Sequence, residues 1–587
     1  MIPIMIKAWF KSGTPWVWLN AAAVSACLIM VIGVLGLILV RGAVHFWPSQ
    51  VVQFSYQEPD GQIRTIIGEH VDTSITPAAM AKSTGYQMAD DEDTLVQYLI
   101  KTGNRDLTGT DFRWILERNV KQQQSPAELM VIERREWGNF YGQLVAVKEN
   151  DKIIAEGAGA WPAAQTRIDQ ALAVFEEIAH LEKKQVGAIN YSLEQLRLEQ
   201  KRLQLKNLWD AAAEQRLTAE KAELEIEYKK YQAQLSELYR QIRRDSVVAK
   251  ADDCMDAGGT TPRTGEVELR LEQQSGATQG AVAESCHNVE IPLAKVVRIY
   301  RPNTMSLFDK IGHYGVKVVE FLTDEPREAN TEGGIFPAIF GTVMMVIMMS
   351  IIVTPFGVIA AVYLREYAKQ GFITRLIRIS VNNLAGVPSI VYGVFGLGFF
   401  VYILGGNIDQ LFFPEAAPAP VYGTPGLLWA SITLALLTLP VVIVSTEEGL
   451  ARIPRSIREG SLALGATKLE TLWLTVLPMA SPAMMTGLIL AVARAAGEVA
   501  PLMLVGVVKL APTLPLDGNY PFLHLDRKFM HLGFHIYDVG FQSPNVEAAR
   551  PLVYATSLLL VLVIVGLNLS AILIRNHLRE KYRALEG

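Results

Sequence analysis

Long runs of apolar residues alternate with polar stretches along the chain. A helix needs about 20 mostly apolar residues to cross the roughly 30 Å hydrocarbon core of a bilayer. Six runs come close to this length or exceed it: 17–40, 335–364, 384–404, 427–445, 479–508 and 552–574. The pattern therefore predicts a membrane protein of six transmembrane helices.

The first run has an alternative interpretation as a removable secretory signal, because Val24-Ser25-Ala26-Cys27 resembles a lipoprotein cleavage site. The apolar core of a signal peptide covers only about 7–15 residues. This run continues past Cys27 to Arg41. We therefore interpret 17–40 as a retained membrane anchor.

Basic residues in the short loops predict the orientation, because Lys and Arg are retained on the cytoplasmic side. They are concentrated before the first run, between runs two and three, between runs four and five, and after run six, while the loop 405–426 has none. Both termini are therefore expected in the cytoplasm, with 1–16 as the cytoplasmic N-terminus. The segment 41–334 then lies on the opposite, outer side of the membrane, which the family resemblance described below implies is the periplasmic side of an inner membrane.

The patterns within 41–334 predict an inserted α+β domain. Heptad spacing of apolar residues within about 165–245 predicts a coiled-coil arm. Polar residues interrupt its seam near Asn207 and Asp210, so one long rod and two antiparallel helices both stay open. The flanks are β-rich; the expected strands lie in Val51–Ser55, Ile63–Ile67, Gln143–Ile154, Glu266–Leu271 and Val289–Tyr300.

Composition narrows the function classes. The chain has 587 residues, of which 50% are hydrophobic and 19% charged, and its net charge is -5. These values exclude a disordered chain and give no basic footprint for nucleic acid. Cys254 and Cys286 lie in the predicted outer domain, where a disulfide between them is compatible with an oxidising compartment; two unpaired thiols are the alternative.

Two charged residues, Arg494 and Glu498, stand inside the fifth apolar run. Counted from Met479 at 1.5 Å per residue, Arg494 lies about 22 Å along a helix. A lone charge there costs at least about 2.5–3.5 kcal/mol, so both groups should face protein or a water-filled path. Four-residue spacing lets them neutralise one another, which leaves a purely structural ion pair as the alternative. Because a guanidinium matches the geometry of tetrahedral oxyanions, we select Arg494 and Glu498 as the candidate substrate pathway.

The loop 447–478 is amphipathic and interrupted by Gly465. It predicts two short helices hinged at Gly465, with charged outer faces, that project from the membrane helices. An amphipathic segment lying in the membrane interface is the alternative.

Catalytic chemistry is not evident in the sequence. The chain has no Gly-x4-Gly-Lys-Ser/Thr phosphate loop, so any ATP and its Mg should be bound by a separate subunit, and we expect no cofactor in this chain. His531 and His535 could share a helix face as metal ligands, but an amphipathic segment is the preferred interpretation, and no metal site is expected. The other members of this histidine and aspartate group are His524, Asp526 and Asp538.

The loop from Glu459 to Pro478 resembles the EAA coupling loop of ATP-binding-cassette importer permeases, although Gly460 and Ser461 replace the two alanines of that motif. Other stretches look like the permeases of the bacterial Pst phosphate importer, and the six spans look more like its A-type than its C-type subunit. The resemblance covers about 334–587. It is carried by Pro355-Phe356-Gly357, Tyr363-Leu364-Arg365-Glu366-Tyr367, Ala385-Gly386-Val387-Pro388-Ser389-Ile390-Val391-Tyr392-Gly393 and 493–501.

This resemblance implies a type I ABC importer permease fold over 335–587 and a non-catalytic transport subunit. It implies four kinds of partner besides the lipid bilayer: a PstC-type permease, a PstB-type ATPase homodimer, a PstS-type binding protein and, as an open option, a phosphate-signalling regulator. It also implies two sets of site residues. ATPase coupling falls on Glu459, Gly460, Ser461, Leu464, Gly465 and Ala466, and helix packing or gating on Gly386, Pro388, Ser389, Gly497 and Pro501.

Within this interpretation Glu459 is expected to contact basic residues of the ATPase, and Gly465 to supply the bend. Two alternatives stay open. The permease could carry another oxyanion, such as sulfate or molybdate. The chain could instead be a membrane-anchored sensor or scaffold whose working part is the coiled-coil arm.

Overall fold

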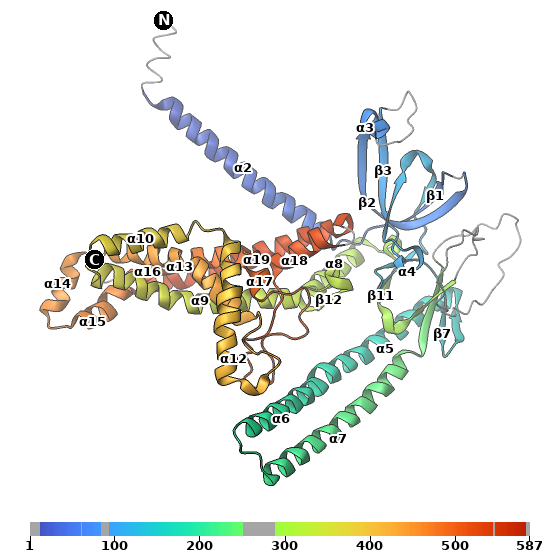
Figure 1. The fold of residues 1–587 in the computed structure, drawn as a ribbon. Coiled ribbons are helices and arrows are strands. Elements are labelled where there is room, and N and C mark those ends of the chain that lie inside the picture. The colour runs from blue at the N-terminus through green and yellow to red at the C-terminus, as the bar shows by residue number, and fades with distance from the viewer. Residues whose placement is uncertain (1–11, 60, 84–92, 251–287, 544–545, 583–587) are drawn as a thin grey trace, which may run out of the picture. The chain divides into compact units, whose positions relative to one another are not determined.

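A computed structural model describes residues 12–59, 61–83, 93–250, 288–543 and 546–582 (Figure 1). These residues form two compact units. The first comprises Met1–Trp47, Arg197–Ala211 and Lys317–Gly587, and the second comprises Pro48–Leu196 and Ala212–Val316. Cys254, Cys286 and the predicted strand Glu266–Leu271 lie outside the described residues, so the disulfide and this strand stay predictions.

Among the described residues, six helices are long and apolar enough to cross a bilayer. This agrees with the six predicted spans. The candidate spans are Thr14–Val44 (α2), Phe336–Tyr367 (α9, Phe336–Val362, with the π-helical turn η7, Tyr363–Tyr367), Ser389–Phe412, Leu427–Arg452 (α13), Lys468–Gly497 and Ala549–Glu580, the last within α19 (Val546–Tyr582).

The fifth span differs from the predicted range 479–508: its helix already begins at Lys468, and the predicted end is wrong because the helix stops at Gly497. It begins in α15 (Lys468–Glu470), continues through the π-helical η10 (Thr471–Val476), and ends with α16 (Leu477–Gly497). Pro501 accounts for the early end, because a proline ring clashes with the carbonyl of the residue four positions before it. Glu498 is already extended, with ψ 136°.

The third span also starts later than predicted. An amphipathic helix, α10 (Phe372–Leu384), precedes it, and a turn that includes Gly386 and Pro388 leads into α11 (Ser389–Phe395). The π-helical η8 (Gly396–Gly405) and α12 (Gly406–Phe412) complete the span. In the view of Figure 1, α10 follows the direction of α9 and α13, whereas the segment ending in α12 runs across it.

The core of the first unit is formed mainly by α9, α13 and α16. Ala491, Ala495 and Ala496 of α16 are buried in it together with Leu434 and Leu437 of α13. Small side chains at a helix contact let the backbones approach closely, which is what drives helix association in lipid. One face of α16 is therefore occupied by its own chain.

The second unit contains two antiparallel sheets. The first has the order β4-β3-β2-β1-β5 and the second has the order β10-β9-β7-β6-β11, with β8 paired to β7. The predicted β-rich segments within the described residues contain strands. The bounds are β1 Val51–Gln57, β2 Ile63–Pro77, β3 Thr94–Lys101, β4 Phe112–Leu116, β5 Val120–Gln124, β6 Met130–Arg134, β7 Phe140–Glu149, β8 Lys152–Glu156, β9 Asp245–Lys250, β10 Asn288–Pro292 and β11 Val296–Tyr300.

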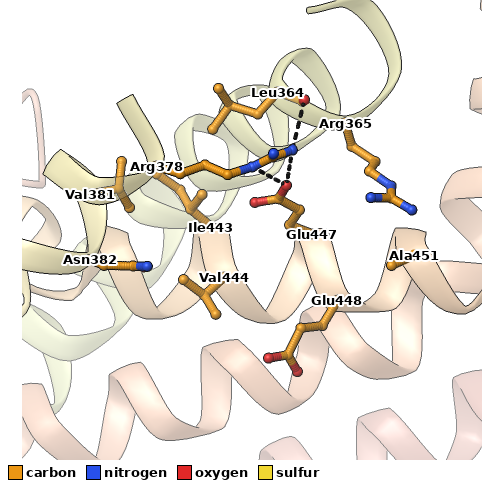
Figure 2. Close-up of a pocket in the computed structure, with 10 residues that line it drawn as sticks. All are labelled: Leu364, Arg365, Arg378, Val381, Asn382, Ile443, Val444, Glu447, Glu448 and Ala451. Atoms are coloured by element: carbon orange, nitrogen blue, oxygen red, sulfur yellow. Dashed lines mark hydrogen bonds and ion pairs between the residues drawn. The ribbon is translucent and has the colours of Figure 1, made fainter. Parts of the chain in front are cut away.

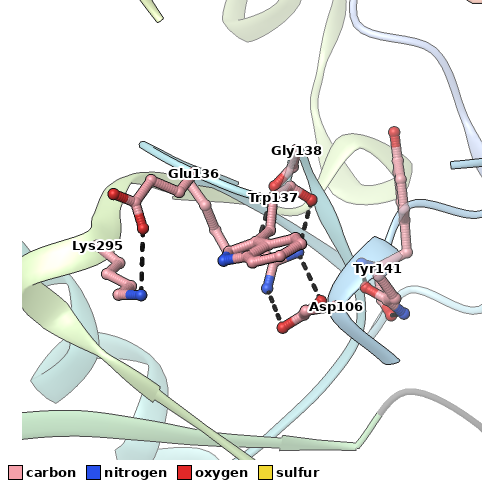
Figure 3. Close-up of polar contacts among 8 residues, drawn as sticks. Asp106, Glu136, Trp137, Gly138, Tyr141 and Lys295 are labelled. Atoms are coloured by element: carbon pink, nitrogen blue, oxygen red, sulfur yellow. Dashed lines mark hydrogen bonds and ion pairs between the residues drawn. The ribbon is translucent and has the colours of Figure 1, made fainter. Parts of the chain in front are cut away.

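A buried arginine fixes the turn between β6 and β7. Arg134, whose side chain is 3% exposed, forms a two-pronged ion pair with Asp106, with N···O distances of 2.8 and 3.0 Å. It also donates to the carbonyls of Trp137 and Gly138. Figure 3 shows Asp106 beside Trp137 and Gly138, with Lys295 bonded to Glu136 nearby. Removing one partner of such a pair is costly, because the other charge is left buried without compensation.

The predicted arm is helical. It consists of α5 (Ala160–His180), the π-helical η3 (Leu181–Val186), α6 (Gly187–Leu205) and α7 (Ala211–Ile242). The hydroxyl of Tyr239 in α7 donates to Glu182 in η3 at 2.6 Å, and Figure 1 shows the two sides of the arm running antiparallel. Of the two open alternatives, the structure therefore contains the folded-back pair of helices and not the single rod.

Candidate functional site

Arg494 and Glu498 form an ion pair at the end of α16. Arg494 Nε lies 3.6 Å from Glu498 Oε1, and the two side chains are 33% and 20% exposed. The predicted pairing is therefore present. Glu498 has left the helix, however, so the two residues do not share a helical face as expected. The accessible fraction of both groups means that this chain alone does not seal the pair.

The pair lies next to the buried face of α16 and to α11. Ala495 and Ala496, which lie between Arg494 and Glu498 in the sequence, are fully buried against the core. Tyr392 of α11 is close enough to Arg494 for an electrostatic interaction. Its hydroxyl donates to the carbonyl of Leu384 at 2.5 Å, which links α11 to the end of α10. This hydrogen bond holds the start of the third span against the end of α10.

A close backbone contact positions the segment that carries Glu498. A Cβ added at Gly393 would lie 2.6 Å from Pro501 Cα and 3.0 Å from Pro501 O, so only glycine fits. Sequence reasoning named Pro501 but missed Gly393, although this glycine ends the quoted Pro388-Ser389 motif. The predicted residue Gly497 makes no such contact, because a Cβ there would meet nothing within 4 Å.

The remaining residues predicted for packing or gating lie at the start of the third span. Gly386 donates its amide to the carbonyl of Asn383 at 3.0 Å, which closes the turn after α10. Pro388 caps α11, and Ser389 is its first residue. These residues form the bend between α10 and the span, and no described contact joins them to Arg494. Their role in gating stays a prediction.

The loop predicted to couple to an ATPase forms two short helical segments around Gly465. The first is α14 (Arg455–Ala463), and the second begins at α15. Gly465 has a φ of +92°, a left-handed conformation that favours glycine. Thr467 and Glu470 form a reciprocal capping box that starts the second segment. The predicted hinge therefore lies where the sequence placed it.

The outer surface of this loop carries exposed charged residues, as expected, among them Arg455 and Glu459, and it carries exposed apolar residues as well. Leu464 is 91% exposed, and Trp473 is 69% exposed. Leu462, Leu469 and Leu474 are exposed as well. Of the predicted coupling residues, Glu459, Gly460, Leu464 and Gly465 are exposed, whereas Ser461 and Ala466 are partly buried. Leu462 and Leu464 lie on the projecting part of the loop, where exposed apolar side chains are typical of a protein contact, whereas Leu469, Trp473 and Leu474 belong to the fifth candidate span.

A cavity of about 260 Å³ lies beside this loop, at the predicted cytoplasmic ends of the second and fourth spans. Figure 2 shows Arg378 between Glu447 and the carbonyl of Leu364, with Arg365 and Glu448 extending separately. Arg378 Nε donates to Glu447 Oε1 at 2.7 Å. The lining is thus charge-balanced, and neither Arg494 nor Glu498 belongs to it.

The histidines considered as metal ligands belong to a buried polar cluster. Burial lowers the pKa of His531 to about 3 and that of His535 to about 4, so both imidazoles are neutral. Asp538 is 1% exposed and pairs with Lys509 at 3.1 Å. His524 bonds to Asp517 instead. No group of three or more metal-ligating side chains occurs among the described residues.

Comparison with known proteins identifies relatives of the membrane region. Residues 353–584 match the model of the family described as binding-protein-dependent transport system inner membrane component. The phosphate transport system permease protein PstA of Mycobacterium leprae is 34% identical over 263 residues, which is 44% of this chain and 77% of that protein.

Two further similarities are more limited in extent or likeness. The probable ABC transporter permease protein YqgH of Bacillus subtilis is 33% identical over 35% of this chain, and the chain spans only 63% of that relative. A structure of the MetNI methionine ABC transporter in inward-facing conformations matches with 19% identity and a TM-score of 0.31, covering 41% of this chain and 94% of that one.

Proposed function

The chain belongs to the family of binding-protein-dependent transport system inner membrane components, and we propose that it is a PstA-type permease subunit of an ATP-driven phosphate importer. A permease of this family is a transport subunit and not an enzyme. Relatives from Mycobacterium leprae and Yersinia pestis, 34% and 31% identical, carry the name PstA. That likeness supports phosphate as the substrate.

The observation that carries the proposal is the partly accessible pair of Arg494 and Glu498 at the end of α16. One face of this helix packs on its own chain, while the side chains of the pair retain exposed surface. In an assembly with a second permease, the pair would line half of a shared path. A guanidinium offers parallel N–H donors that match two oxygens of a tetrahedral anion.

The carboxylate of Glu498 favours phosphate over sulfate in this arrangement. Phosphate keeps at least one hydroxyl near neutral pH and can donate it to a carboxylate, whereas sulfate has only acceptor oxygens. A fully deprotonated anion beside Glu498 would suffer like-charge repulsion. Arg494 would supply affinity, and Glu498 would supply selectivity and keep the site from retaining the anion too strongly.

The proposal includes partners and an orientation. A PstS-type binding protein would deliver phosphate from the periplasm, and a PstC-type permease would complete the path. An ATPase dimer of PstB type, holding ATP and Mg, would dock on the loop around Gly465, where exposed Leu462 and Leu464 offer an apolar contact. The termini would lie in the cytoplasm, the inserted unit in the periplasm, and a phosphate-signalling regulator would be a further partner.

Uptake of labelled phosphate by cells that lack this chain, with and without its restoration, tests the proposal. We expect restoration to recover uptake and excess unlabelled phosphate to abolish it, with little competition from sulfate or molybdate. Phosphate uptake that is intact without the chain would contradict the proposed substrate. Strong competition by sulfate would instead indicate a permease for another oxyanion.

A further inference from the structure

The π-helical turn η7, which ends the second span, is held from both sides of the loop around Gly465. Its residue Glu366 has a side chain that is only 13% exposed. Helix ends leave backbone carbonyls without intrahelical donors, and cationic side chains commonly satisfy them. Two cationic residues of the loop do so here, one from each side of Gly465.

The first contact comes from Arg458 in α14. Its guanidinium lies 2.8 Å from Glu366 Oε1 and also donates to the carbonyls of Leu450, at 2.8 Å, and Ile453, at 2.6 Å. These carbonyls belong to the end of α13 and the residue that follows it. One partly buried arginine therefore joins α14, the end of the fourth span and the end of the second span.

The second contact comes from Lys468, the first residue of α15. Its ammonium donates to the backbone carbonyl of Glu366 at 2.7 Å. It also lies 4.2 Å from the centre of the Tyr367 ring, which is within the range of a cation–π interaction. Glu366 thus binds α14 through its carboxylate and α15 through its carbonyl.

Without the contacts to Glu366, the two helical segments of the loop would be joined mainly by a flexible hinge at Gly465. Gly465 has open space around its Cα and a left-handed backbone conformation, so it does not restrict the angle between them by packing. Ser461 and Thr471 add one hydrogen bond, of 2.9 Å, across the base of the loop. With Arg458 and Lys468 both fixed on Glu366, the loop and the end of the second span can move as one body.

We propose that Glu366 is a positioning residue for energy coupling. Through Arg458 and Lys468 it binds both helical segments of the loop, α14 and α15, to the second span, so that a displacement of the loop is passed to that span. This inference rests on the proposed function as an ABC importer permease. Glu366 touches neither substrate nor nucleotide in this account. Its effect is on the ratio of transport to ATP hydrolysis.

The test uses the complete transporter in proteoliposomes, with phosphate uptake and ATP hydrolysis measured on the same vesicles. Glu366→Gln keeps the size of the side chain and removes its charge. We expect phosphate transported per ATP hydrolysed to fall about 2- to 30-fold, the range for substitutions that act on coupling between sites. The matched control is Lys369→Gln, an exposed position three residues away, which should keep the wild-type ratio.

A merely structural role predicts a different result, because loss of assembled ATPase lowers uptake and hydrolysis together and leaves their ratio unchanged. The amount of ATPase that co-purifies with each variant measures this directly. Lys468→Met, which alters an exposed residue, gives a second measurement if Glu366→Gln assembles poorly, and its ratio should fall too. An unchanged ratio of phosphate transported to ATP hydrolysed in both variants would overturn the proposed role of Glu366. A wild-type assembly that takes up no phosphate would overturn the proposed function instead.

Discussion

Replacement of Gly393 by alanine should destabilise the membrane region through its contact with Pro501. The added Cβ would lie 2.6 Å from the Cα of Pro501, a backbone atom that cannot rotate away. Overpacking of this kind costs about 1–3 kcal/mol. Alanine also favours a helix over glycine by about 0.5–1 kcal/mol, which offsets part of that cost. Gly398 provides the control, because a Cβ there meets nothing within 4 Å.

Thermal unfolding of the two variants in the same detergent measures the difference. Gly398→Ala should be as stable as the wild type or slightly more stable, and Gly393→Ala should be less stable than Gly398→Ala by about 1–3 kcal/mol. At about 2–4 °C per kcal/mol for a domain of 150–250 residues, the two Tm values should differ by about 2–12 °C. Equal Tm values would refute the close contact between α11 and Pro501.

Three further predictions concern separate parts of the chain. Asp106→Asn leaves buried Arg134 without its anionic partner, at a cost of about 3 kcal/mol; hydrogen exchange in β6 should accelerate about 100-fold, and unchanged exchange would contradict the ion pair. Burial lowers the pKa of His531 to about 3 and that of His535 to about 4, whereas both have a pKa of about 6.5 in the unfolded chain. Their contribution to the free energy of unfolding is therefore fully present above about pH 6.5 and is lost as the pH falls toward the folded pKa values. Tm should therefore fall between about pH 6.5 and 4, and less steeply in His535→Gln. Glu498→Gln removes a repelling charge, so sulfate should inhibit phosphate uptake at a concentration at least about tenfold lower than in the wild type; unchanged inhibition would argue against a selective role.

Hydropathy predicted the spans because a bilayer imposes one strong requirement, about 20 apolar residues per helix. The same requirement cannot define where a helix ends inside an apolar run. The fifth run continues to Val508, but Pro501 stops the helix at Gly497 for a steric reason that hydropathy does not register. A proline four residues after a glycine was the available signal for this end.

The candidate site was predictable in part for the same reason. Arg494 and Glu498 stood out because charges are rare in apolar runs, whereas Gly393 and Glu366 were invisible without tertiary contacts. Gly393 is required only because α11 approaches Pro501 closely. Glu366 has its role only because the chain folds back and brings Arg458 and Lys468 to it. The coupling-loop hinge at Gly465 and the charged residues beside it were recognisable from local sequence, but the exposure of Leu464 was not.

Initial-rate phosphate uptake by the reconstituted transporter carrying Arg494→Ala tests the central claim most directly. Loss of charge-assisted hydrogen bonds to the anion, about 1.5–3 kcal/mol, should lower uptake about 10- to 100-fold, while the variant still assembles with its ATPase. Uptake at the wild-type rate by that assembled variant would contradict a phosphate path through Arg494.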